Sequence, residues 1–402
     1  MSKRPLEDLV VLDFTKVYSG PYCTLLLADL GATVIKIERK GSGDDSRAFR
    51  PNPNIIEGSG YFMYINRNKK SIELDLKDPK ALEIVYKLCE KADIVVENNA
   101  PGTSEKLGIG YEDLKKHNPK IIYGSITGFG QYGPYRNKPA YDLIAQAMGG
   151  YMALTGEKGG RPLKLGTSMG DAIAGVHMAY AILAAVHHRD RTGEGQFIDI
   201  AMMDSCFATL ENHVMIETME DVTPIRNGNS NQNASPFNTY RTKDGYVCIA
   251  VANDGLFERF CNAIDRTDLI HDPRFEINAI RKSNEDQLTP LVEEWTLQHT
   301  TKEICDLFEE RRIPAGPILG LDELVNDPHI LAREMMIEHE HPYGGKIRMP
   351  GCPIKFSETP IDTFEPSARL SADTEEILQK YGDYTPEEIE KLYSEGTIFK
   401  HE

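Results

Sequence analysis

The sequence predicts an α/β protein with a mostly parallel sheet. In the first third of the chain, short runs rich in β-branched residues alternate with helical stretches of about ten residues, a pattern typical of βαβ units. The composition, with 40% hydrophobic and 27% charged residues, is that of a globular protein with ample material for a core. A chain of 402 residues is long enough for two or three domains, or for one large elaborated domain.

The first third of the chain supplies the expected sheet. In order, we expect a strand at LVVLDFT, a helix at GPYCTLLLADLG that ends at Gly31, strands at ATVIKIE and SIELDL, a helix from about Asp78 to Lys91, a strand at DIVVENN, a helical YEDLKKHN and a strand at KIIYGSITGFG. Ligands of such sheets bind beyond the carboxyl ends of the strands. The turns TKVYSGP, ERKGSGDDSR and ENNAPGT are therefore the places to look for a site.

The rest of the chain suggests a second, smaller unit. Residues 140–185 are helix-rich, and GQFIDIAM predicts another buried strand. Residues 221–238 are rich in Asn, Ser, Gly and Pro, the composition of a linker or a loop that covers a site. The runs YVCIAVA, GLFERFCNAI, TPLVEEWTLQH and TKEICDLFEERR indicate a small α+β domain. We expect domain bounds at 1–220, 221–238 (linker), 239–326 and 327–402, the last part holding turns and two polar helices.

Charge and cysteine content narrow the partners and the compartment. The formal net charge of −17 argues against nucleic acid or an anionic membrane as the main partner, because both require a concentrated positive surface. The N-terminal stretch has no apolar core of a signal peptide, and no apolar run approaches the roughly 18 residues of a membrane span. The seven cysteines are scattered and form no CxxC pair. We expect a cytoplasmic protein with free thiols.

Two motifs that could suggest a cofactor or a metal are weak. Residues 128–133, GFGQYG, match G-x-G-x-x-G after a strand, but the following PYRNKP cannot easily begin a helix. No acidic residue ends a second strand about 20 positions later, as ribose binding requires. The histidines at 187–188 and at 339 and 341 lack a surrounding ligand set. We expect neither a permanently bound cofactor nor a metal.

Asp171 lies between a small-residue turn and an apolar stretch with helical periodicity, in KLGTSMGDAIAGVHMAYAIL. An Asp directly before such a helix is a preferred N-cap, so it can be structural. The same position suits chemistry, since a helix N-terminus favours the ionised carboxylate, and a carboxylate can attack an acyl group. The local sequence leaves both interpretations open.

Basic side chains cluster near the predicted strand ends. Arg39 and Lys40 follow the second strand, and Lys69, Lys70 and Lys77 flank the third. In a protein this acidic, cations at one rim of a sheet suit a phosphorylated ligand. Solvated loops are the alternative.

Taken together, these stretches resemble the class III CoA-transferases of the CaiB/BaiF type. The resemblance runs in order through VLDFTKVYSGP, LGATVIKIERKGSGDDSR, NRNKKSIELDLKDP, ADIVVENNAPG, NPKIIYGSITGFGQYGP, PAYDLIAQAMGG, GDAIAGVHMA, GEGQFIDIAM, DPRF, RRIPAGP and NDPHILARE. Within the family, the sequence is most similar to formyl-CoA:oxalate, acetyl-CoA:oxalate and succinyl-CoA:dicarboxylate CoA-transferases.

The resemblance implies a doubly wound, Rossmann-like large domain made of N- and C-terminal parts, with a small domain inserted, and an interlocked homodimer. It implies transfer of CoA from an acyl-CoA to a free carboxylic acid, such as a short dicarboxylate, with CoA and acyl-CoA as substrates. The nucleophile of the family falls on Asp171, which would pass through an anhydride and an aspartyl-CoA thioester. The CoA contacts of the family fall on Val17, Tyr18, Ser19, Arg39, Leu74, Lys77, Asn98, Asn99, Lys106, Tyr141 and Asp142.

The chain departs from its relatives at several positions. Tyr18 stands where relatives have Gln, and Lys106 where they often have Arg. NGNSNQNASPF replaces the glycine-rich cover loop of the oxalate-acting relatives, and Ser371-Ala372-Asp373-Thr374 replaces Gly-x-His-Thr.

Three other functions remain as alternatives. An α-methylacyl-CoA racemase of the same fold would carry a His-Asp pair where this chain has Tyr141-Asp142, and Tyr is a poor base near neutral pH. A non-catalytic acyl-CoA-binding protein would form no adduct on Asp171. A dehydrogenase would depend on GFGQYG alone.

Overall fold

The computed structural model describes residues 4–51, 58–361 and 363–400. The chain forms two compact units. The larger unit comprises residues 1–152, 164–222 and 329–402, and the smaller comprises 153–163 and 223–328.

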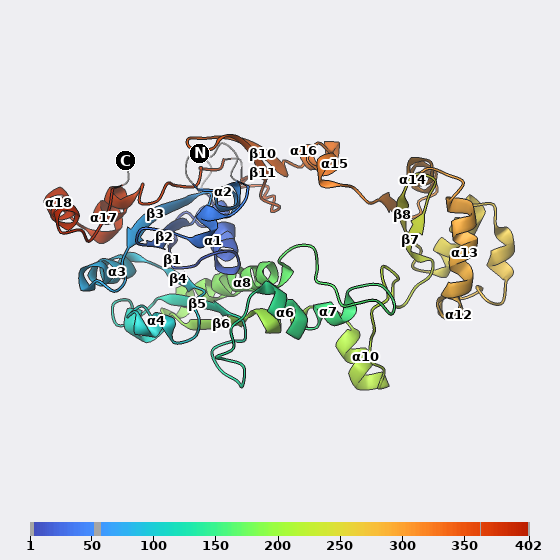
Figure 1. The fold of residues 1–402 in the computed structure, drawn as a ribbon, viewed down its shortest axis with the longest axis horizontal. Coiled ribbons are helices and arrows are strands. Elements are labelled where there is room, and N and C mark those ends of the chain that lie inside the picture. Colours follow the sequence, from blue (N-terminus) through green and yellow to red (C-terminus); the bar gives the residue numbers. More distant parts are fainter. Residues whose placement is uncertain (1–3, 52–57, 362, 401–402) are drawn as a thin grey trace. The chain divides into compact units, whose positions relative to one another are not determined.

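The larger unit is built on a six-stranded sheet (Figure 1). Its strands are β1 (Val10–Asp13), β2 (Thr33–Arg39), β3 (Lys69–Leu74), β4 (Ile94–Glu97), β5 (Ile122–Thr127) and β6 (Phe197–Ala201). They lie in the order β3-β2-β1-β4-β5-β6, and every neighbouring pair is parallel. This is the order of a doubly wound sheet, with its switch point between β1 and β4. The expected α/β fold with a parallel sheet is confirmed.

Helices cover both faces of the sheet, because successive strand residues point to opposite sides. Leu12 of β1 belongs to one core, which includes residues of α3 (Pro79–Lys91), α17 (Thr374–Gly382) and α18 (Pro386–Ser394). Val11 belongs to the other core, shared with α1 (Ser19–Asp29) and α8 (Met169–Thr192). The chain therefore places α1 and α8 together on one face, and the residues at their N-termini meet near the carboxyl edge of the sheet.

Helix α8 corrects one expectation from the sequence. An 18-residue window of this helix has a mean hydropathy of 1.5, so within the described residues α8 is long and apolar enough, by length and composition alone, to cross a membrane. The expectation that no apolar run approaches this length was wrong. In the structure, α8 packs against α1, β5 and β6, and 39% of this window is buried.

The connections of the larger unit contain short helices and one hairpin. The remaining elements are η1 (Asp45–Ala48), α2 (Gly60–Ile65), α4 (Thr103–Lys106), α5 (Tyr111–Leu114), α6 (Asp142–Met148), α7 (Tyr151–Leu154), α9 (Met202–Ala208), α10 (His213–Glu220), α16 (Pro328–Ala332), β10 (Met336–His341) and β11 (Gly345–Pro350). The antiparallel pair β10–β11 lies where the sequence suggested only turns. Its strands are rich in Glu, His, Lys and Arg, so they lack the apolar alternation by which strands are recognised.

The smaller unit has its own core. A three-stranded antiparallel sheet of β7 (Phe237–Arg241), β8 (Tyr246–Ala250) and β9 (Ala315–Pro317) shares an aromatic-rich core with α11 (Asp254–Ala263), η2 (Thr267–His271), α13 (Glu285–Thr296) and α14 (Thr301–Glu310). Within the described residues, two further helices, α12 (Asn278–Ser283) and α15 (Leu321–Leu324), contribute no residue to this core. Helix α14 begins with a capping box between Thr300 and Glu303, which satisfies two backbone donors reciprocally.

Candidate active site

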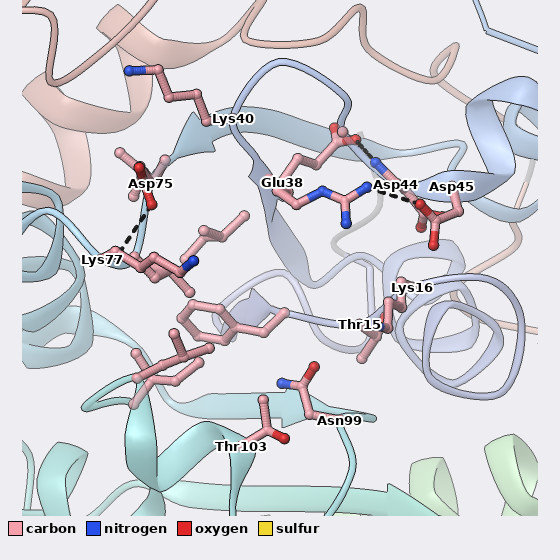
Figure 2. Close-up of a pocket in the computed structure, with 18 residues that line it drawn as sticks. Thr15, Lys16, Glu38, Lys40, Asp44, Asp45, Asp75, Lys77, Asn99 and Thr103 are labelled. Carbon is pink, nitrogen blue, oxygen red and sulfur yellow. Dashed lines mark hydrogen bonds and ion pairs between the residues drawn. The ribbon is translucent and has the colours of Figure 1, made fainter. Parts of the chain in front are cut away.

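A cavity of about 480 Å³ opens at the carboxyl ends of β1, β2 and β3 (Figure 2). We call it the outer cavity. Lys40 and Lys77 line it after the ends of β2 and β3, and Asn99 and Thr103 lie on the opposite side. The Lys40 ammonium points away from the cavity and lies over the Phe399 ring. Arg39 also lines it and forms an exposed ion pair with Asp45 at 3.0 Å. Cations at strand ends around a cavity of this size suit a phosphorylated ligand such as a nucleotide.

A second cavity of about 270 Å³, the inner cavity, adjoins the first because Lys16 and Asn99 line both. It contains Asp171 together with the β1–α1 turn, the start of the β4–α4 connection and the segment before α6. Two cationic residues that the sequence analysis missed, Arg136 and Lys138, line it as well. They belong to the irregular segment after β5 that contains GFGQYG, which is a turn and not the start of a helix.

The structure gathers most of the residues named from the resemblance. The outer cavity is lined by four of them, Arg39, Leu74, Lys77 and Asn99. The inner cavity is lined by Val17, Tyr18, Ser19, Asn98, Asn99, Tyr141 and Asp171. Lys106 and Asp142 line neither of these two cavities. Lys106 is the exposed last residue of α4, whereas Asp142 is buried.

Asp171 is the third residue of α8 and not its N-cap, which is Ser168. The cap interaction comes from elsewhere in the chain. A carboxylate oxygen of Asp142 accepts the backbone N–H of Gly170 at 2.8 Å and that of Asp171 at 3.3 Å, and Gln146 donates to its other oxygen at 2.7 Å. The interpretation of Asp171 as an N-cap was therefore wrong, because Ser168 is at that position and Asp142 accepts two of the free N–H groups at the helix start. The Asp171 side chain lines the inner cavity instead.

The electrostatics of Asp171 also differ from the expectation. Burial and, to a lesser degree, the charge of Asp142 raise its pKa, hydrogen bonding with Ser19 opposes them, and the net result is a pKa of about 7. The expectation that the helix N-terminus keeps this carboxylate ionised was wrong, because burial disfavours the charge and Asp142 already accepts N–H groups at the helix end. Asp171 is instead a carboxyl group that changes its charge near neutral pH.

The turn between β1 and α1 is held by a buried ion pair. Val17 has a φ of 68°, which is costly for a β-branched residue. Its backbone N–H donates to Asp44 at 3.2 Å, and the Lys36 ammonium lies 2.9 Å from Asp44 and donates to the carbonyl of Thr15 at 2.8 Å. Both side chains are 1% exposed. The sequence carried one hint, a Lys between two Ile residues in a buried strand.

Aromatic side chains stand beside the carboxylate. The rings of Tyr18 and Tyr22 stack at 5.5 Å between centroids, and Tyr61 lies 6.1 Å from Tyr18. Burial raises the pKa of Tyr18 and of Tyr61, and the charge of Asp171 contributes to both shifts. The two phenols therefore remain protonated and can donate hydrogen bonds near Asp171. Nothing in the local sequence singled out Tyr61.

Comparisons with known proteins decide the family. CoA-transferase family III matches residues 6–374. The chain belongs to this family. It is 42% identical to succinyl-CoA:mesaconate CoA-transferase of Haloarcula hispanica over 365 residues, covering 88% of this chain and 90% of that one. It is 38% identical to succinyl-CoA:glutarate CoA-transferase of Mus musculus over 401 residues, covering 100% of this chain and 92% of the other.

The fold agrees with this assignment. The crystal structure of a CAIB/BAIF family protein from Brucella suis superposes with a TM-score of 0.84 at 35% identity, covering 95% of this chain and 100% of that one. The predicted class, a CoA-transferase that uses CoA thioesters as substrates, is confirmed. Within the described residues, no cluster of three or more His, Cys, Asp or Glu side chains is arranged to hold a metal ion.

Proposed function

We propose that this CoA-transferase uses Asp171 as its nucleophile to move CoA from an acyl-CoA to a short dicarboxylate. The observation that carries the proposal is the position of Asp171 in an inner cavity that adjoins a larger one, whose lining includes both cations and carboxylates. The nucleotide of CoA would occupy the outer cavity, near Arg39, Leu74 and Lys77, and the pantetheine arm would pass Lys16 and Asn99 to bring the thioester to Asp171.

The chemistry follows from the carboxylate. A carboxylate oxygen of Asp171 attacks the thioester carbonyl, the C–S bond breaks, and CoA leaves as a thiolate while an aspartyl anhydride remains. The thiolate then attacks the aspartyl carbonyl, which releases the first acid and forms an aspartyl-CoA thioester. The acceptor carboxylate attacks this thioester to give a new anhydride, and the thiolate finally attacks the acceptor's carbonyl to release the new acyl-CoA and the free carboxylate. Excluding water during these steps preserves the thioester energy.

A dicarboxylate fits the charges of the inner cavity. One carboxylate must reach Asp171, and a second needs a cation, which Arg136 and Lys138 can supply. The named activities of the two relatives, with mesaconate and with glutarate, support the same choice. We expect monocarboxylates of equal length to be transferred with a much lower kcat/KM.

We also propose a cytoplasmic, interlocked homodimer in which residues 1–220 and 327–402 form a large domain, and residues 239–326 form a small domain joined through 221–238. Several apolar side chains of the larger unit are exposed on the single chain, which a second copy would cover. They are Tyr141 (79% exposed), Leu143, Ile144, Val176, Tyr180 (75%) and Phe207.

The deciding experiment is covalent trapping. The enzyme is incubated with an acyl-CoA carrying an isotopic label, quenched with hydroxylamine or borohydride, and digested for mass spectrometry. We expect the modification in the peptide that spans residues 166–177, and only when acyl-CoA is present. Efficient CoA transfer with no modification of that peptide would refute the nucleophile, and exchange of α-hydrogen for deuterium without an acceptor would point to a racemase.

A further inference from the structure

Ser19 occupies a defined position between Asn98 and Asp171. It is the first residue of α1 and is 5% exposed. The three side chains line the same inner cavity, and the Ser19 hydroxyl lies near enough to the Asp171 carboxyl to lower its pKa. The resemblance assigned Ser19 to CoA binding, which does not use this contact.

The Ser19 hydroxyl has a second polar neighbour, Asn98. The backbone N–H of Lys16 donates to Asn98 Oδ1 at 2.9 Å, and Asn98 Nδ2 donates to the Lys16 carbonyl at 2.8 Å. These two bonds fix which end of the amide is the donor. Asn98 Nδ2 also donates to Ser19 Oγ at 3.3 Å. This bond uses one lone pair of the Ser19 oxygen and not its proton, so the proton can be donated to Asp171.

The packing of two helices brings Ser19 to Asp171. Gly175 lies one turn after Asp171 on the same side of α8, and a Cβ atom there would lie 2.7 Å from the carbonyl oxygen of Ser19. Only glycine permits so close an approach of α1 to α8 at this level. The close packing of the helix pair thus holds Ser19 near Asp171.

We propose that Ser19 is a catalytic residue, which donates its hydroxyl proton in a hydrogen bond to the oxygen of Asp171 that bears negative charge at each step. This proposal rests on Asp171 being the nucleophile. In the free enzyme the bond orients the carboxylate. When thiolate or acceptor carboxylate attacks the aspartyl carbonyl carbon, the carbonyl π electrons move to its oxygen, and Ser19 stabilises that oxyanion without losing its proton. The electron pair on that oxygen then re-forms the carbonyl double bond as the bond to the departing carboxylate or thiolate breaks. Preorganised donors at such an oxygen are worth roughly 10²–10³-fold in rate.

The test compares Ser19→Ala and Ser19→Cys with the natural enzyme. Cys keeps the volume of Ser but is a weak donor, so it separates hydrogen bonding from packing. We expect both variants to lose about 10²- to 10³-fold in kcat, with the KM for acyl-CoA changed less than about threefold. The acid limb of the pH profile of kcat/KM should move to higher pH in both, since a hydrogen bond that favours the ionised carboxylate is gone.

Covalent trapping separates this proposal from the one on which it rests. Under single-turnover conditions, the Asp171 adduct should form and decay more slowly in both variants than in the natural enzyme. If Ser19→Cys restores the natural rates, or if Ser19→Ala keeps them, the proposal fails while the nucleophile stands. If the natural enzyme itself transfers CoA without any adduct on Asp171, the underlying mechanism fails. Equal melting temperatures of the three proteins would show that the variants are folded.

Discussion

Two carboxylates of the larger unit, Asp44 and Asp171, show how the same side chain can be structural or reactive. Burial by itself raises the pKa of both. Beside Asp44, the Lys36 ammonium and the hydrogen bonds from Ser46 hold the pKa below its usual value. Beside Asp171, the charged neighbour is another carboxylate, Asp142, and the pKa rises to about 7.

The two carboxylates differ in their charged neighbours, because Asp44 is paired with a cation whereas Asp171 lies near another carboxylate. Asp44 uses its oxygens to hold Lys36, Ser46 and the backbone of Val17, so it cannot attack a substrate. The helix end that could have stabilised Asp171 is occupied by Asp142. A buried carboxylate without a cation is costly, and such a residue in a cavity is a candidate for catalysis.

Among the substitutions that test this comparison, we expect the replacement of Asp171 to have the largest effect. We expect Asp171→Asn to reduce CoA transfer by at least about 10³-fold, because an amide cannot form the anhydride. Binding of CoA, measured by calorimetry, should change little, since the outer cavity is untouched. Substantial residual transfer would place the nucleophile elsewhere.

The next largest effect concerns Asp44. We expect Asp44→Asn to lower the free energy of unfolding by about 3–5 kcal/mol at pH 7, because Lys36 would be buried without its partner. The folded pKa of Asp44 lies below its ordinary value of 3.8, so its stabilisation is present above that pH and is lost as the pH falls further. Denaturant unfolding should show the gap between the two proteins closing below about pH 4.

The neighbouring residue provides the matched control for Asp44. Asp45 pairs with Arg39, but the two side chains are 51% and 66% exposed. We expect Asp45→Asn to cost less than about 1 kcal/mol, as exposed pairs do. Equal losses in the two variants would mean that burial of the Lys36–Asp44 pair does not matter.

These carboxylates also show what the sequence could predict. The hydrophobic periodicity of strands and helices predicted the parallel sheet. The ordered motifs predicted the family and pointed to Asp171 as the candidate nucleophile. Its burial and its proximity to Asp142 come from contacts between residues 29 positions apart, which no local pattern encodes. The same holds for Lys36 and Asp44, which meet only when β2 and the following loop are folded. The hairpin β10–β11 was missed because its polar residues lack the apolar alternation of a strand.

The pH dependence of activity is a smaller but sharper test. Because attack requires the carboxylate, we expect kcat/KM to rise about tenfold per pH unit below about 7 and to level off above it. Asp142→Asn should move this limb to lower pH, since it removes a negative neighbour while keeping a residue that caps helices well. If the acid limb of the kcat/KM profile does not move in Asp142→Asn, the group that titrates there is not Asp171.

The smallest expected effect is that of Asp171→Asn on the free energy of unfolding. Its sign is opposite to the effect of Asp44→Asn. The folded pKa of Asp171, about 7, lies above its ordinary value of 3.8. The natural protein therefore loses stability as the pH rises from 3.8 to about 7. Asn has no charge to bury at any pH. We expect Asp171→Asn to be more stable than the natural protein by about 1–2 kcal/mol at pH 8, after discounting for partial exposure, and equally stable at pH 4. Thermal unfolding at the two pH values measures this gain. A variant that is less stable at pH 8 would mean that the carboxylate is favourably solvated or paired, and that Asp44 and Asp171 do not differ as described.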